Sequence, residues 1–262
     1  MSAWSVRRLA FEPKDWQIRF RHRLREALAG LQATPGSVLQ ATYAAPDDAF
    51  VDVENVLVYN VGTGCFRHVT GDGITLRRTR SADHRHGLRY EMVPATALRA
   101  GGPSAVRFAA EVADVRDLAA VWRAVRQATP VPPDTRIEGR FRLALTLTDR
   151  SAQPATALST VMKPLLDGVL SAFSVHTGED TPAVAERLAL RLGVRPGQIA
   201  AELARPGWGV LGGREVVRPY RHHVQWNPAD DRCDEADLRV VRRTTPGAPR
   251  WRIAGLIDAL GS

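Results

Sequence analysis

The residues most suggestive of chemistry in this chain are two acids that stand one residue apart, in the sequence Asp52-Val53-Glu54-Asn55. In an extended segment, side chains two residues apart project from the same face, so both carboxylates would point the same way. Carboxylate oxygens are ligands that Mg²⁺ and Mn²⁺ prefer, and such an ion activates water for phosphodiester hydrolysis. Asp52 and Glu54 are therefore candidate catalytic residues and candidate ligands of Mg²⁺ or Mn²⁺.

A second candidate pair lies much later in the chain, where Lys163 precedes Asp167 by one turn of an expected helix. A lysine held in this way can neutralise the charge that develops on a phosphate during its hydrolysis, which makes both residues candidate catalytic residues. The alternative is an ordinary ion pair between positions i and i+4 on a helix surface.

These two stretches resemble the motif of RusA-like Holliday-junction endonucleases, in which a strand is followed by D-x-D-N-x-x-K-x-x-x-D and later by an acidic pair. The matching residues are, in chain order, Asp52, Glu54, Asn55, Lys163, Asp167 and the pair Asp230-Asp231. The match is split. Val58 occupies the lysine position after the first stretch, and Ala157 and Ser159 occupy the acidic positions before the second. The resemblance implies a metal-dependent nuclease whose two half-motifs must converge in one pocket.

The overall charge favours an acidic partner. The formal net charge is +8 and the pI is about 10.4, which favours nucleic acid or an acidic protein as a partner. Of 36 basic residues only Lys14 and Lys163 are lysines, a skew that GC-rich codon usage also produces. Residues 52–57, 167–169 and 226–231 are in fact similar to uncharacterised proteins of GC-rich bacteria, a kinship that implies no activity.

A basic helix is the element expected to bind such a partner. Residues 15–31 carry apolar side chains at spacings of three and four, which predicts an amphipathic helix with Asp15 as its N-cap. Its other face is dense in positive charge and is the candidate nucleic-acid-binding surface. The arginines of that face are Arg19, Arg21, Arg23 and Arg25. The alternative interpretation is a solvated helix face without a ligand.

The other periodic segments predict an α+β fold. Expected strands cover 37–43, 66–69, 74–78, 88–93 and 140–148, and expected helices cover 114–128, 156–173 and 182–192. The Val-rich segment 50–61 fits either a strand or a buried helix. Thr70-Gly71-Asp72-Gly73 predicts a hairpin turn between the second and third of these strands. A short helix is expected near the end of the chain.

Prolines 130, 132 and 133 are the expected boundary between two halves. Residues 1–130 would form a sheet-rich α+β half that includes the basic helix, and residues 134–262 would form a mixed half with several helices and an acidic turn. Both halves follow the order helix, Ala-Thr-Pro, strand, loop, apolar segment, glycine. This order is consistent with a diverged internal duplication.

The sequence also narrows the compartment and the cofactor. With two cysteines and no signal-peptide or membrane-spanning pattern, we expect a cytoplasmic protein with reduced thiols and no membrane partner. Cys65-x-x-His68, with His84 and His86, offers a set of zinc ligands whose spacing also arises by chance. The phosphate-binding G-x-x-x-x-G-K-[ST] motif, H-E-x-x-H and G-x-S-x-G do not occur.

Two functions of different classes remain. The first is a diverged metal-dependent nuclease that binds nucleic acid through the basic helix. The second is a non-catalytic interaction or scaffold protein, in which the same acids and arginines are structural pairs. The nuclease requires the two acidic stretches to meet, whereas the interaction protein requires an exposed apolar patch.

Overall fold

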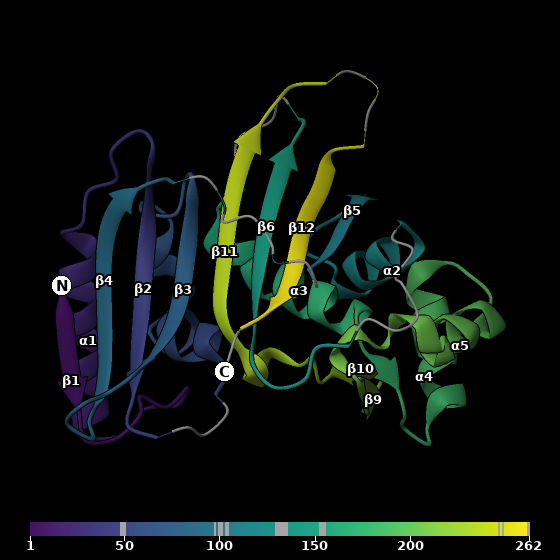
Figure 1. Ribbon diagram of the computed structural model, residues 1–262, viewed down its shortest axis with the longest axis horizontal. Helices are drawn as coiled ribbons and strands as arrows, with labels where there is room; N and C mark the ends of the chain where they lie inside the picture. Colours follow the sequence, from purple (N-terminus) through teal and green to yellow (C-terminus); the bar gives the residue numbers. More distant parts are fainter. Residues whose placement is uncertain are drawn as a thin grey trace.

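The computed structural model describes residues 1–47, 51–96, 98, 102, 105–128, 136–151, 156–245, 247 and 249–260, without the side chains of residues 206–208. Within these residues the chain forms a mixed eight-stranded sheet with helices against one face (Figure 1), which confirms the predicted α+β class. From edge to edge the strands are β1 (Ser2–Ser5), β4 (His86–Pro94), β2 (Ser37–Ala45), β3 (Gly73–Arg80), β11 (Cys233–Arg242), β6 (Phe141–Asp149), β12 (Trp251–Ala259) and β5 (Val106–Val112).

The helices and short strands complete the described chain. They are α1 (Trp16–Ala29), the π-helix η1 (Asn55–Tyr59), η2 (Thr63–Phe66), α2 (Leu118–Ala128), α3 (Leu158–Ala172), β7 (Val175–His176), α4 (Thr181–Leu192), α5 (Pro196–Ala204), η3 (Pro206–Leu211), β8 (Gly213–Arg214), β9 (Val217–Tyr220), β10 (His223–Trp226) and η4 (Asp230–Arg232). Among the described residues no helix is long and apolar enough to cross a membrane.

The four long helices that were expected are confirmed, with small differences at their ends. Phe20, Leu24 and Leu28 bury one side of α1, as their spacing predicts, but Asp15 makes no capping hydrogen bond. The helix α3 continues through Pro164 and is not broken there. It is buried along most of its length between the sheet and neighbouring helices, so tertiary packing outweighs the missing proline N–H.

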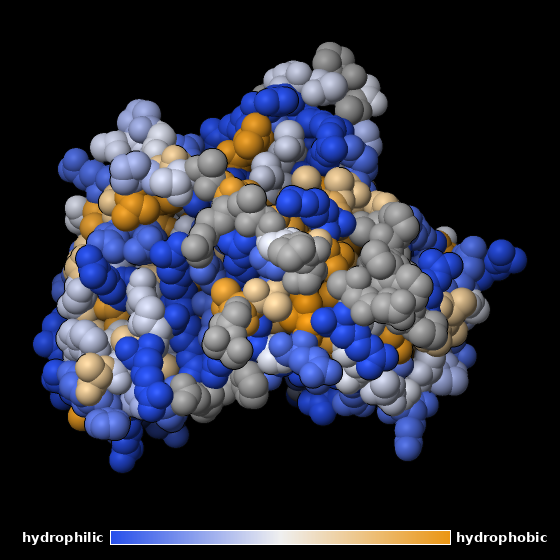
Figure 2. Space-filling view, in the orientation of Figure 1, coloured by the Kyte–Doolittle hydropathy of each residue, from blue (hydrophilic) through white to orange (hydrophobic). Residues whose placement is uncertain are grey.

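The two faces of the sheet differ in chemistry. Leu76 of β3 and Ala236 of β11 face the helices, because they line a common cavity with Leu166 of α3. Alternation along the strands therefore turns Arg77 and Glu235 to the opposite face, where they form an ion pair of 3.1 Å. In the view of Figure 2, hydrophilic side chains cover much of this face between small hydrophobic areas. The helices therefore pack on the apolar face of the sheet, and the opposite face is polar.

The sheet repeats one pattern on either side of the antiparallel pair β3 and β11. In each half the inner strand pairs in parallel with a nine-residue strand (β2 or β6), which pairs antiparallel with another nine-residue strand (β4 or β12). The edge strand, β1 or β5, is antiparallel again. A helix, α1 or α2, joins each edge strand to the nine-residue parallel strand. This repeated topology is the arrangement expected of a diverged internal duplication.

Two expectations about the connections are wrong. The hairpin at Thr70–Gly73 does not form, because residues 63–66 are the helix η2 and β3 pairs instead with β2 and β11. Gly73 serves a close approach, since a Cβ there would lie 2.2 Å from the carbonyl oxygen of Leu238. The expected terminal helix is the strand β12, whose Ile253 and Ile257 are buried between β6 and β5.

The expected boundary at prolines 130–133 lies outside the described residues. The strand β5 and helix α2, which precede it, belong to the same half of the repeated sheet as β6 and β12, which follow it. The division of the chain into two domains at 130–134 stays a prediction.

Candidate functional site

The first half-motif lies at the start of a helical segment between β2 and β3. Residues 53 and 54 are helical and η1 follows directly, so the extended geometry assumed for Asp52 and Glu54 is wrong. Asp52 caps this segment: one carboxylate oxygen accepts the backbone N–H of Asn55 at 2.9 Å, and the other accepts its side-chain amide. Helix capping thus fixes the orientation of the Asp52 carboxylate.

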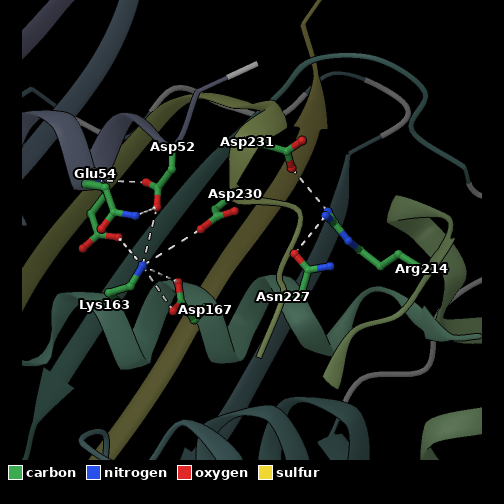
Figure 3. Close-up of polar contacts among 9 residues, drawn as sticks. Asp52, Glu54, Lys163, Asp167, Arg214, Asn227, Asp230 and Asp231 are labelled. Carbon is green, nitrogen blue, oxygen red and sulfur yellow. Dashed lines mark hydrogen bonds and ion pairs between the residues drawn. The ribbon is translucent and has the colours of Figure 1, made fainter. Parts of the chain in front are cut away.

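The second half-motif projects from α3 towards the first (Figure 3). The ammonium Nζ of Lys163 lies 3.5 Å from an oxygen of Asp52 and 3.4 Å from one of Glu54. It lies 3.4 Å from Asp167, one helical turn along α3. The two stretches that the sequence separates by more than a hundred residues therefore form one cluster, as the resemblance requires.

A fourth acid comes from η4. An oxygen of Asp230 lies 4.0 Å from the Lys163 ammonium. The adjacent Asp231 points elsewhere and pairs with Arg214 at 3.3 Å, next to Asn227 (Figure 3). Of the late acidic pair, Asp230 alone joins the cluster. We call Asp52, Glu54, Asp167 and Asp230 with Lys163 the acidic cluster.

The acidic cluster is buried and carries excess negative charge. The side chains of Glu54 and Asp167 are 5% and 8% exposed, and within the described residues Lys163 is the one cation within 4.0 Å of the four acids. Burial raises the pKa of Glu54 well above its ordinary value, Lys163 opposes this, and Asp52 and Asp167 add to it. Burial lowers the pKa of Lys163 by itself, but the carboxylates, led by Glu54, raise it overall.

Two further acids of the cluster, Asp167 and Asp230, also have raised pKa values. Burial raises the pKa of Asp167 to about 6, against the opposing effect of Lys163. Burial, the charge of Asp52 and a hydrogen bond with it raise the pKa of Asp230 to about 8. Groups with strongly displaced pKa values in one cluster are typical of functional sites, although structural networks also produce them.

The raised pKa of Asp230 predicts that, without metal, the folded protein becomes less stable as the pH rises. A carboxyl with a pKa of about 8 in the folded protein and about 4 in the unfolded chain binds its proton more tightly when folded. Folding is therefore favoured below pH 4 by this group, and that contribution is lost as the pH rises through 8. We expect the melting temperature in EDTA to fall between pH 5 and pH 9, and Asp230→Asn to flatten that fall. Asp231→Asn, the matched control, should leave the slope unchanged; an unchanged slope in Asp230→Asn would contradict the prediction.

The two half-motifs occupy equivalent places in the repeated sheet. The Asp52 segment connects the parallel strands β2 and β3, and α3 begins the connection between the parallel strands β6 and β11. Each connection keeps the motif residues that the other lacks. By motif position, Ala157 and Ser159 of the second connection correspond to Asp52 and Glu54 of the first, and Val58 of the first corresponds to Lys163 of the second. The acidic cluster therefore draws residues from equivalent connections in the two halves of the repeated sheet.

The donor chemistry of the cluster suits a hard divalent cation. A cavity of about 20 Å³ is lined by Asp52, Glu54 and Asp230 among others, which is room for one water-sized particle. The Oε1 atom of Glu54 is buried and has no hydrogen-bond partner. Among the described residues no group of three or more His, Cys, Asp or Glu side chains could hold a metal ion as they stand. The acids of the cluster close instead on the Lys163 ammonium.

The four arginines predicted to bind nucleic acid fall into two groups. Arg19 and Arg23 are exposed. Arg25 donates from Nε to the carbonyl oxygen of Val61 at 2.6 Å, and Arg21 donates to two carbonyl oxygens of the loop before α1. Two of the four predicted nucleic-acid contacts thus hold backbone in place, and their binding of nucleic acid stays a prediction.

The proposed zinc ligands do not assemble. Nδ1 of His86 lies 2.7 Å from the hydroxyl of Tyr43, and Nε2 of His68 lies 3.2 Å from the carbonyl oxygen of Leu28. Each ring therefore has its own partner in the fold. Among the described residues, these side chains do not form a group of three or more that could hold a metal ion.

Sequence patterns do not single out Tyr59, which borders the cluster. Its ring centroid lies 5.6 Å from the Lys163 ammonium, and burial, with the charge of Glu54, raises the pKa of its phenol. Tyr59 follows Asn55 by four residues, and this spacing places it near the cluster only once the segment is known to be helical.

Comparison of the chain with models of known protein families and with curated proteins finds no match.

Proposed function

We propose that this protein is a metal-dependent nuclease of the RusA-like kind, acting on phosphodiester bonds at the acidic cluster. The observation that carries the proposal is the convergence of both half-motifs on one lysine: Asp52, Glu54, Asp167 and Asp230 all lie within 4.0 Å of the Lys163 ammonium. A surface ion pair between Lys163 and Asp167 would not need three further acids, drawn from two other elements.

Asp52, Glu54 and Asp230 are the residues that would hold Mg²⁺ or Mn²⁺. A bound ion of this kind supplies an activated water and neutralises phosphate oxygens. The buried, partnerless Glu54 oxygen and the adjoining small cavity support this donor set. Lys163 has a flexible four-carbon stem, so its ammonium can leave the centre of the acids without a change in the helix.

Lys163 is the residue suited to meet the substrate. Its side chain is 29% exposed, whereas those of the four acids are 5% to 23% exposed. An ammonium at this position stabilises negative charge on a phosphate as it develops. Asp167 positions the ammonium from one turn along α3. The chain's net charge of +8 attracts a polyanionic substrate despite the local excess of acids.

The test is cleavage of labelled single-stranded, duplex and branched DNA and RNA in Mg²⁺, Mn²⁺ and EDTA. We expect metal-dependent cleavage that falls roughly 10²-fold or more in Asp167→Asn and Glu54→Gln, the scale for removing one charged group from a site of this kind. The matched control, Asp231→Asn, removes a neighbouring acid outside the cluster and should cleave as the wild type does. The proposal would be overturned if Asp167→Asn cleaved as well as the wild type does, or if the wild type cleaved in EDTA.

A non-catalytic interaction protein is the second candidate, and three observations favour it. Lys163 already compensates part of the acidic charge, and no described group could hold a metal as it stands. Large apolar side chains are also exposed near the start of the chain: Trp4 at 47%, Val6 at 76% and Phe11 at 66%. Absence of cleavage with every substrate and both metals would leave this function standing.

A further inference from the structure

A groove opens beside the acidic cluster. It has a volume of about 510 Å³, and its lining includes Arg8 and Phe11 from the loop before α1 and Asp52, Asn55 and Asn60 from the helical segment. Asp52 also belongs to the acidic cluster, so anything in the groove lies next to the reactive acids. We call this space the Arg8–Phe11 groove. Its size falls within the range of small-molecule sites.

The loop that forms one wall has no helix or strand but is firmly held. Four consecutive carbonyl oxygens, those of residues 8–11, accept hydrogen bonds from side chains. Gln17 donates to the first at 2.9 Å, Asn60 to the second at 2.8 Å, and Arg21 to the third at 3.1 Å and to the fourth. Leu9 is 1% exposed and anchors the loop in the core. The loop is therefore a built support and not a loose connection.

The support presents two exposed side chains, Arg8 and Phe11. Phe11 is 66% exposed, although an aromatic ring gains most from burial. Arg8 is exposed, and within the described residues it forms no ion pair. Within the described residues the backbone beneath both side chains is fixed while both side chains stay exposed, an arrangement that suits binding of a ligand.

We infer that the Arg8–Phe11 groove binds an unpaired nucleotide of a nucleic-acid strand, with its base stacked on Phe11 and a phosphate on Arg8. An exposed aromatic ring beside a cationic side chain is the combination that binds single strands, since every base has a face that stacks. An apolar peptide or a second apolar surface would not call for the arginine, and an acidic peptide would not call for the exposed ring. The inference rests on the proposed function only for the position of the cut, because Asp52 would face the phosphate next to the stacked nucleotide.

The test measures binding without cleavage, by fluorescence anisotropy of a labelled oligothymidylate and a labelled oligouridylate in EDTA. We expect Phe11→Ala to weaken binding roughly tenfold, the scale for losing one stacked base, and Phe11→Trp to restore it. Arg8→Ala should weaken binding and make it less dependent on salt, by about one phosphate contact. The matched control is Leu190→Ala, which removes an apolar side chain that is 88% exposed on α4, and it should bind as the wild type does.

The outcomes separate this inference from the proposed function. Weaker binding by Phe11→Ala, in a protein that never cleaves, would support the groove and overturn the nuclease. Equal binding by Phe11→Ala and wild type would overturn the groove, whatever the cleavage assay gives, and so would a wild type that binds neither oligonucleotide or prefers duplex without regard to Phe11. A preference between the two oligonucleotides would show whether the nucleotide is of DNA or RNA. Thermal melts of each variant show that the fold is intact.

Discussion

Lys163→Met should destabilise the protein by about 3 kcal/mol at pH 8, because it leaves four partly buried acids without the cation that they surround. For a chain of this length such a loss lowers the melting temperature by roughly 10 °C. The loss should be smaller at pH 5, since the acids can then bind protons in place of the ammonium. Chemical and thermal unfolding at the two pH values measure it.

The chain supplies a matched control for this change. Lys14→Met removes the other lysine, which is exposed before α1, and should change stability little. Millimolar Mn²⁺ should raise the melting temperature of Lys163→Met more than that of the wild type, because a divalent cation can then occupy the place of the ammonium. A Lys163→Met protein as stable as Lys14→Met would show that the cluster does not depend on this charge.

Asp52→Asn should remove the response of the protein to metal. A cation that binds only the folded state stabilises it by mass action, about 2.7 kcal/mol at a concentration one hundred times the dissociation constant. We therefore expect Mn²⁺ to raise the melting temperature of the wild type by several degrees, and we expect little or no rise in Asp52→Asn. The structure adds a third candidate to metal and arginine for balancing these acids, namely Lys163.

Asp231→Asn is the control for this second experiment, since it removes an acid of the same turn that pairs with Arg214 instead. It should keep the full response to Mn²⁺. A wild-type melt that is indifferent to millimolar Mn²⁺ would contradict metal binding at the cluster. In that case Asp52→Asn should report only the loss of its bonds to Lys163 and Asn55.

The residues of the candidate site could be named from the sequence, but their meeting could not be derived from it. Lys163 and Glu54 lie 109 positions apart, and the periodicity of either segment says nothing of which elements pack together. The resemblance to a known motif supplied the requirement that they converge. Choosing Asp230 over Asp231 depended on the direction in which η4 turns its side chains, which only the fold determines.

Local patterns failed where tertiary contacts outweighed them. For the Val-rich segment 50–61 the pattern left a strand and a buried helix open, and the helix, with Val56, Leu57 and Val58 buried, is what forms; the extended geometry assumed for Asp52 and Glu54 was the part that failed. The glycines of Thr70-Gly71-Asp72-Gly73 suit a tight hairpin, but Gly73 is needed where β11 comes close. The long amphipathic helices were predictable because their own spacing defines the face that packs.

Although the sheet is repeated, one chain carries one acidic cluster and not two. A symmetric pair of identical subunits presents two equal sites to the two antiparallel strands of a duplex. In this chain a second, equivalent cluster would have to be built from the residues at the corresponding motif positions. These are Val58, Gly62, Ala157 and Ser159, none of which bears a charge. If the proposed activity holds, a single chain would cut one strand of a duplex and leave a nick, and cutting both strands would take a second chain or a second encounter.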